Sequence, residues 1–100
     1  MKKTFFPTET WDSRWRIDFN FENFILKGEE ISFYFTSSYN VPPARLLGFT
    51  YTEYLKFCRQ NGALLKGKNG YTHPVWGNKE ECEMICKLLN KEWDKVAAEF

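Results

Sequence analysis

The side chains that could carry metal or nucleophilic chemistry in this 100-residue sequence are one histidine and three cysteines: His73, Cys58, Cys82 and Cys86. They are the ligand types of a structural zinc site, but zinc-binding cysteines usually come as close pairs on turns. Cys82 and Cys86 lie instead one turn apart in a predicted helix, beside Ile85, where a free cysteine behaves as a small apolar residue. We therefore predict no metal site and no cofactor.

No combination of a nucleophile, a base and an orienting group can be named in the chain, although a catalytic site requires one. Cys58 falls on the apolar side of a predicted helix, whereas a reactive thiolate needs exposure and a positive neighbour. The sequence contains no Gly-x-Ser-x-Gly, His-Glu-x-x-His or Walker motif. Residues 67–70 have the composition of a phosphate loop, but no helix begins after them to bind a phosphate. We predict that the protein is not an enzyme.

Composition and charge narrow the classes of partner. The chain has 14 basic and 13 acidic residues and a net charge of +1, which excludes a highly basic nucleic-acid coat and an acidic mimic of DNA. Its 43% hydrophobic content suits a globular protein, and its 19% aromatic content predicts a core of large rings. Because a chain of this length forms one domain, we expect a single domain over residues 1–100.

The sequence shows no membrane or secretory signal. After Lys2 and Lys3 the apolar stretch is only Phe5-Phe6-Pro7, which is too short for a signal peptide, and no window approaches about 18 consecutive apolar residues. The number of cysteines is odd, and two of them share one predicted helix, which is not a disulfide framework. We expect a cytoplasmic protein without a membrane partner.

Alternating residues predict two strands in the first part of the chain. Residues 14–22 alternate between polar and apolar without a break, which buries one face of a strand: Trp15, Ile17, Phe19 and Phe21. A second strand is predicted at about 30–36, after a turn at Lys27-Gly28-Glu29. Residues 37–48, which contain Pro42-Pro43, are predicted to be an irregular linker.

The second half of the sequence predicts two helices separated by a hairpin. Thr50 and Glu53 form a capping box for a helix that ends at Gly62, and Asn78 begins a helix that runs to about residue 99. An Asn-Gly pair at 69–70 predicts a two-residue turn between strands. The last helix has one apolar stripe: Cys82, Ile85, Cys86, Leu89, Trp93, Val96 and Ala97. The predicted fold is α+β in the order ββ-α-ββ-α, a small antiparallel sheet of two hairpins with two helices packed on one face.

Positive charge gathers around the second predicted hairpin. Residues 53–79 carry five basic residues and one acidic residue, a net charge of +4, whereas residues 80–100 carry a net charge of −3. The two-residue turn pairs lysines with rings, a combination that suits a phosphate backbone and a stacked base. A nucleic-acid interface is therefore one alternative, at Lys66, Lys68, Tyr71 and His73. The other interpretation is that these lysines keep an exposed hairpin soluble.

The polar face of the first strand and the irregular linker carry residues typical of protein interfaces, because Tyr and Arg often anchor such contacts. These candidates for partner binding are Arg14, Arg16, Tyr34, Tyr39, Asn40 and Arg45. The competing interpretation is that most of the aromatic residues simply fill the core of a small domain. The pattern assigns Trp11 and Trp76 neither to the core nor to the surface.

The stretch Leu-Leu-Gly-Phe-Thr-Tyr-Thr-Glu-Tyr-Leu-Lys-Phe-Cys-Arg, then Asn61-Gly62-Ala63, then Cys86-Lys87-Leu88-Leu89-Asn90-Lys91-Glu92-Trp93, resembles small uncharacterised proteins of gut Firmicutes and of their phages and mobile elements. The resemblance covers the C-terminal half and includes no catalytic or ligand motif. It implies a context in which short phage-borne proteins bind and block a host defence factor. We expect a non-enzymatic protein that binds and inhibits a host protein. The alternatives are nucleic-acid binding through residues 66–73 and sequestration of a small ligand in an aromatic pocket.

Overall fold

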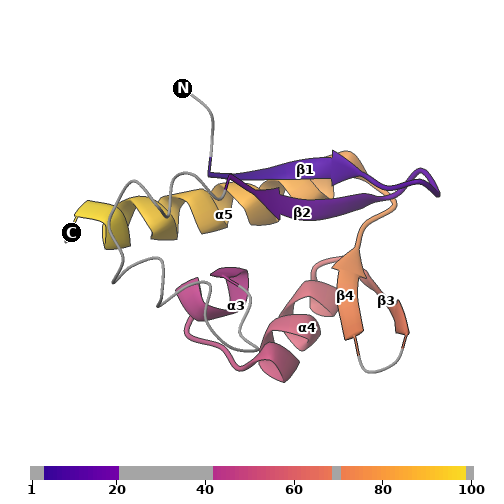
Figure 1. The fold of residues 1–100 in the computed structure, drawn as a ribbon, viewed down its shortest axis with the longest axis horizontal. Coiled ribbons are helices and arrows are strands. Elements are labelled where there is room, and N and C mark those ends of the chain that lie inside the picture. The colour runs from indigo at the N-terminus through magenta and orange to yellow at the C-terminus, as the bar shows by residue number, and fades with distance from the viewer. Residues whose placement is uncertain (1–3, 21–41, 69–70, 99–100) are drawn as a thin grey trace.

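The computed structural model of the chain describes residues 4–20, 42–68 and 71–98, whose arrangement Figure 1 shows. The described elements are two β-hairpins and three helices, in the order β1-β2-α3-α4-β3-β4-α5. This confirms the predicted α+β class and the order ββ-α-ββ-α. Two details differ from the prediction: among the described residues each hairpin is a two-stranded sheet of its own, and a short helix precedes the first long one.

The first hairpin pairs β1 (Phe5–Glu9) with β2 (Trp15–Phe19). β2 is the predicted alternating strand, and its apolar residues pack against the core as expected: Trp15, Ile17 and Phe19. β1 is not predicted by the sequence, because Pro7 at its centre removes a backbone donor and interrupts the strand signal. The predicted strand at 30–36, its turn at 27–29 and Phe21 lie outside the described residues.

The second hairpin pairs β3 (Leu64–Lys68) with β4 (Tyr71–Val75). Lys68 lies opposite Tyr71 and Lys66 opposite His73, which confirms the register predicted from the Asn-Gly turn. Pro74 is buried and lies opposite Leu65 in β3. That pair is one of those that exchange no hydrogen bonds across the ladder, so the missing N–H of the proline costs β3 nothing.

Helix α4 (Tyr51–Gln60) begins where the sequence indicates. The Thr50 hydroxyl accepts a hydrogen bond from the Glu53 backbone N–H at 3.2 Å, and the Glu53 carboxylate accepts one from the Thr50 N–H at 3.0 Å. These two bonds are the predicted capping box. After the helix, Gly62 has a φ of +94°, a left-handed conformation that glycine adopts without strain.

The prediction of an irregular linker is wrong for residues 42–46, which form the short helix α3 (Pro42–Leu46). Proline is tolerated in the first turn of a helix, because its missing N–H would have no intrahelical partner there. The two prolines therefore begin this helix instead of preventing it. Ala44 in α3 is fully buried and belongs to the core, which ties the segment to the rest of the domain.

Helix α5 (Lys79–Ala98) is 20 residues long and provides one wall of the core. The side chain of Asn78 caps it, accepting hydrogen bonds from the N–H groups of Glu80 and Glu81 at 2.8 and 3.3 Å. Its predicted apolar stripe is confirmed, with five buried residues, Cys82, Ile85, Cys86, Leu89 and Trp93, and two partly buried ones, Val96 and Ala97. α5 packs against the first hairpin, whereas α4 packs against the second (Figure 1).

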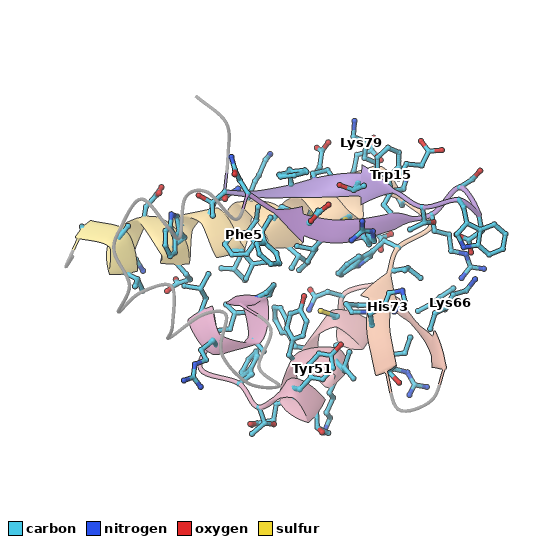
Figure 2. The ribbon with its side chains drawn as sticks, in the orientation of Figure 1. Phe5, Trp15, Tyr51, Lys66, His73 and Lys79 are labelled. Atoms are coloured by element: carbon cyan, nitrogen blue, oxygen red, sulfur yellow. The ribbon has the colours of Figure 1, made fainter. Side chains whose placement is uncertain are left out.

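Two tryptophans join the hairpins to each other. The backbone N–H and C=O groups of Trp15 and Trp76 exchange two hydrogen bonds of 2.7 Å. The Trp76 side chain is fully buried, and its Nε1 donates to the Asn61 carbonyl at 3.0 Å. Lys79 Nζ lies 5.1 Å from the centre of the Trp15 ring, a cation–π contact seen in Figure 2. This bridge sets the described strands in the spatial order β1-β2-β4-β3.

Candidate functional site

The predicted partner-binding residues that the structure describes belong to the first hairpin and to α3. Arg14 and Arg16 belong to the first hairpin, where they lie 3.7 and 3.5 Å from the carboxylates of Asp12 and Asp18. Arg45 belongs to α3, away from the turn of that hairpin (Figure 1). The remaining candidates lie outside the described residues: Tyr34, Tyr39 and Asn40.

The turn of the first hairpin presents Trp11 to solvent on a hydrogen-bonded backbone. The Thr10 N–H donates to the Arg14 carbonyl at 2.7 Å, and the Arg14 N–H donates to the Thr10 hydroxyl at 3.0 Å. Ser13, with a φ of +62°, completes the turn. Trp11 is 96% exposed, although tryptophan is on average one of the more buried residues of a folded domain.

Asp12 connects this turn to the second hairpin. Its carboxylate accepts a hydrogen bond from Lys66 Nζ at 2.6 Å and another from the Thr10 hydroxyl. These two bonds lower the pKa of Asp12 to about 2. Leu64, which is 52% exposed, shares a face of β3 with Lys66 because it lies two residues away. Figure 2 shows Lys66 at this end of the molecule. We call Trp11, Asp12, Leu64 and Lys66 the tip surface.

The sequence indicates Lys66 as a candidate binding residue, but it indicates neither Trp11 nor Asp12. The signal for these two residues is the segment Thr10-Trp11-Asp12-Ser13, in which residues typical of turns surround a tryptophan. Such a segment identifies a turn only when strands are expected on both sides of it. Because β1 is the strand that the sequence does not predict, the turn is not recognised either.

The second hairpin pairs the predicted nucleic-acid residues across its two strands, but one of them, Lys66, forms a salt bridge with a carboxylate of the same chain. Lys66 lies opposite His73, and Lys68 lies opposite Tyr71. His73 is exposed, and the side chains of Lys68 and Tyr71 lie outside the described part of the structure. The salt bridge from Lys66 to Asp12 offsets charge that a phosphate group would otherwise meet.

A pocket of about 370 Å³ opens between β2, α3, α4 and β4. It is lined mainly by rings and apolar side chains, with two basic groups among them: Arg16, Ile17, Phe19, Pro43, Tyr51, Tyr54, His73 and Pro74. The rings of Tyr51 and Tyr54 stack with their centres 6.2 Å apart, and burial raises the pKa of both hydroxyls. The Tyr51 hydroxyl donates to the Thr72 carbonyl. The pocket has the size of a small-ligand site.

The three cysteines are buried in the core: Cys58, Cys82 and Cys86. Burial raises the pKa of the Cys58 thiol to about 11. A hydrogen bond with Cys86, together with burial, raises the pKa of Cys82 well above its ordinary value. Both thiols are therefore neutral at pH 7, whereas nucleophiles and metal ligands are thiolates. Within the described residues, no group of three or more His, Cys, Asp or Glu side chains could hold a metal ion.

Comparisons of the chain with protein-family models, with curated proteins and with solved structures found no match. Among the described residues, no helix combines the length and the apolar composition that crossing a bilayer requires. The chemistry of the tip surface and of the pocket is therefore the basis on which a function is proposed.

Proposed function

We propose that this protein is a non-enzymatic binding protein that recognises another protein through the tip surface. The observation that carries the proposal is Trp11, which is 96% exposed on a hydrogen-bonded turn. Burying such a ring is favourable, and tryptophan is prominent among the residues that dominate the binding energy of protein interfaces. A backbone already ordered before binding reduces the entropy lost on association.

The surroundings of Trp11 suit a protein partner. Trp11 and Leu64 supply apolar area, and Asp12, Lys66 and Arg14 supply charges of both signs around it. An apolar centre with a polar rim is the usual anatomy of a protein–protein interface. A phosphate backbone would instead favour lysines without acidic partners. The contacts of Asp12 therefore support a protein partner at this surface over a nucleic acid.

In its concrete form, the proposal is an inhibitor encoded by a phage or mobile element that binds a host defence protein in the cytoplasm. This form is supported by the sequence resemblance of the C-terminal half. Inhibition by binding requires no nucleophile or cofactor, and it is compatible with cysteines that are buried and neutral. It requires a surface on which a few side chains supply most of the binding free energy, and the exposed ring of Trp11 suits that role.

The test is affinity capture from a lysate of the natural host, with and without nuclease treatment, using the unmodified chain and two variants. Trp11→Ala removes the exposed ring. Met84→Ala is the matched control, because Met84 is also an exposed apolar residue, at 68%, but lies on α5 outside the tip surface. We expect a stoichiometric protein that the unmodified chain and Met84→Ala retain and that Trp11→Ala loses by more than about tenfold.

Two results would contradict this function. Capture that Trp11→Ala leaves unchanged would exclude the tip surface. Capture that disappears on nuclease treatment would favour nucleic acid at the second hairpin, through Lys66, Lys68, Tyr71 and His73.

The pocket supports a second candidate function, sequestration of a small ligand. Its rings and prolines suit a flat apolar body, and Arg16 and His73 suit an acidic group on that body. Small aromatic carboxylates should then raise the melting temperature of the protein by mass action. The same compounds should stabilise an Arg16→Ala variant less. If no compound in the series raises the melting temperature, or if the variant responds equally, this second function is wrong.

A further inference from the structure

The two outer strands of the domain differ in whether their edges can pair with another strand. In the spatial order β1-β2-β4-β3, β1 and β3 are the outer strands among those described. Figure 1 shows β3 at one end of the molecule, beyond β4. An outer strand presents backbone N–H and C=O groups that a further strand can bind unless other contacts satisfy or replace them.

The edge of β1 is closed. The backbone groups of Phe5 and Pro7 face away from β2. The Thr4 carbonyl accepts a hydrogen bond from the N–H of Asn20, which follows β2, and the directions alternate along the strand. Asn90 of α5 binds both backbone groups of Phe5: its Oδ1 accepts from the Phe5 N–H at 2.8 Å, and its Nδ2 donates to the Phe5 carbonyl at 2.9 Å. Pro7 has no N–H to offer. An added strand therefore finds no continuous ladder on β1.

Within residues 4–20, 42–68 and 71–98, the outer edge of β3 is unpaired. The Thr72 carbonyl, opposite Gly67, points away from β3 because it accepts a hydrogen bond from Tyr51. Residues that face each other in such a pair both direct their backbone groups outward, so Gly67 and, two residues earlier, Leu65 face away from β4. Among the described residues, no hydrogen bond from outside the hairpin reaches the backbone of Leu65 or Gly67. Leu64 and Leu65 are 52% and 37% exposed.

We infer that the open edge of β3 binds an extended acidic segment of the partner protein, which adds to the second hairpin as a further strand. The inference rests on the proposed function and specifies how the partner is held. The N–H and C=O groups of Leu65 and Gly67 supply the backbone ladder, and the exposed leucines supply apolar contacts to alternate side chains of the segment. Trp11 precedes Asp12, whose carboxylate forms a salt bridge with Lys66 of β3.

The positive charge of β3 and its surroundings favours an acidic segment as the added strand. β3 has the sequence Leu-Leu-Lys-Gly-Lys, with two lysines and no acidic residue, and residues 53–79 carry a net charge of +4. Asp12 offsets one of these charges and leaves the region positive. Pairing of two copies of this chain through β3 would bring lysines together, and like charges opposite each other destabilise a sheet. Glutamate or aspartate on an added strand would meet lysine instead.

The experiment is a titration of the isotope-labelled full-length chain, followed through its backbone amide NMR signals. The probe is a capped seven-residue peptide of alternating Glu and Val, and the matched probe alternates Lys and Val. A third probe is the Glu-Val peptide with a methyl group on every backbone nitrogen, which removes the ladder donors of both its edges and leaves the protein unchanged. The variants are Leu65→Pro, which removes an outward N–H that the hairpin does not use, and Leu65→Ala, which shortens the side chain and keeps that N–H.

We expect the Glu-Val peptide to shift the amide signals of Leu65 and Gly67 and to protect these amides from exchange. It should bind several-fold more tightly than the Lys-Val peptide. Leu65→Pro and the methylated peptide should abolish these changes, and Leu65→Ala should keep them. Absence of shifts at millimolar peptide, equal binding of the two unmethylated peptides, or undiminished binding of the methylated one would each overturn the inference. The proposed function fails separately, if Trp11→Ala does not affect capture of the partner.

Discussion

The two hairpins have the same size and the same antiparallel topology, but they meet solvent differently. In the first, Phe5 is fully buried against the core, and Asn90 of α5 closes the outer edge. In the second, Leu64 and Leu65 are exposed, and the outer edge has no partner among the described residues. Among the described residues, the outer edge of the first hairpin is therefore closed and that of the second is unpaired.

The two hairpins also differ in the side chains that they contribute to the core and to the surface. Much of the core comes from α5, together with Phe5 of the first hairpin, Tyr54 and Cys58 of α4, and Trp76, which follows β4. The second hairpin and the turn at Trp11 contribute exposed apolar and charged side chains. Binding surfaces carried by turns and edges on a rigid support are common. Substitutions in the first group should therefore change the free energy of unfolding, and substitutions in the second should change binding.

The largest expected effect comes from replacing, one at a time, a buried tryptophan of the core and the exposed tryptophan of the turn. Trp76→Ala should lower the free energy of unfolding by about 3–5 kcal/mol, because it leaves a large cavity and removes the bond from Nε1 to Asn61. Trp11→Ala should change it by less than about 0.5 kcal/mol, because Trp11 is exposed. Urea unfolding followed by circular dichroism measures both. Equal losses from the two substitutions would mean that Trp11 is part of the core and would remove the distinction between the regions.

A smaller loss is expected when the closed edge is opened. Asn90→Leu keeps the size of the side chain but removes the two hydrogen bonds to the N–H and C=O of Phe5, which should cost about 1–3 kcal/mol. The amide hydrogen of Phe5 should also exchange faster with solvent. Lys91→Leu, at the exposed neighbouring position on α5, is the matched control and should change neither quantity. Unchanged exchange at Phe5 in Asn90→Leu would show that the asparagine does not close this edge.

The elements predicted correctly are those specified by short-range signals. The capping box at Thr50 and Glu53, the cap at Asn78 and the Asn-Gly turn act within a few residues and need no tertiary contact to be recognised. The stripe of α5 has a helical period over 20 residues, so its buried face is also visible in the sequence.

The elements missed are those that depend on partners far away in the sequence. β1 contains a proline at its centre, and it is held by β2 and by Asn90, 85 residues from Phe5. The tip surface depends on the salt bridge between Asp12 and Lys66, 54 residues apart. The pocket combines Arg16 and His73, which the sequence assigns to two different functions. Spacing along the chain contains no information on such contacts.

The smallest expected effect concerns the salt bridge that ties the two regions together. The pKa of Asp12 is lowered from 3.8 to about 2 in the folded chain. At a pH above the pKa of the unfolded chain, the ionised carboxylate therefore stabilises the fold. This contribution is lost as the pH falls through the pKa of the folded chain. The unmodified chain should therefore be slightly more stable than Asp12→Asn at pH 7. The difference should shrink between pH values of about 4 and about 2.

Urea unfolding over this pH range measures the difference, with Asp94→Asn on the exposed side of α5 as the control. Lys66→Met removes the largest cause of the lowered pKa, so the pH dependence of its stability should be weaker than that of the unmodified chain. Added salt should reduce the effect of Asp12→Asn, since exposed charges are screened. A difference that persists unchanged to pH 2, or that Lys66→Met leaves as it is, would mean that Asp12 stabilises only its own turn. The Asp12–Lys66 salt bridge would then not hold β3 against the turn at Trp11, and the Trp15–Trp76 bridge would be the contact that joins the two hairpins among the described residues.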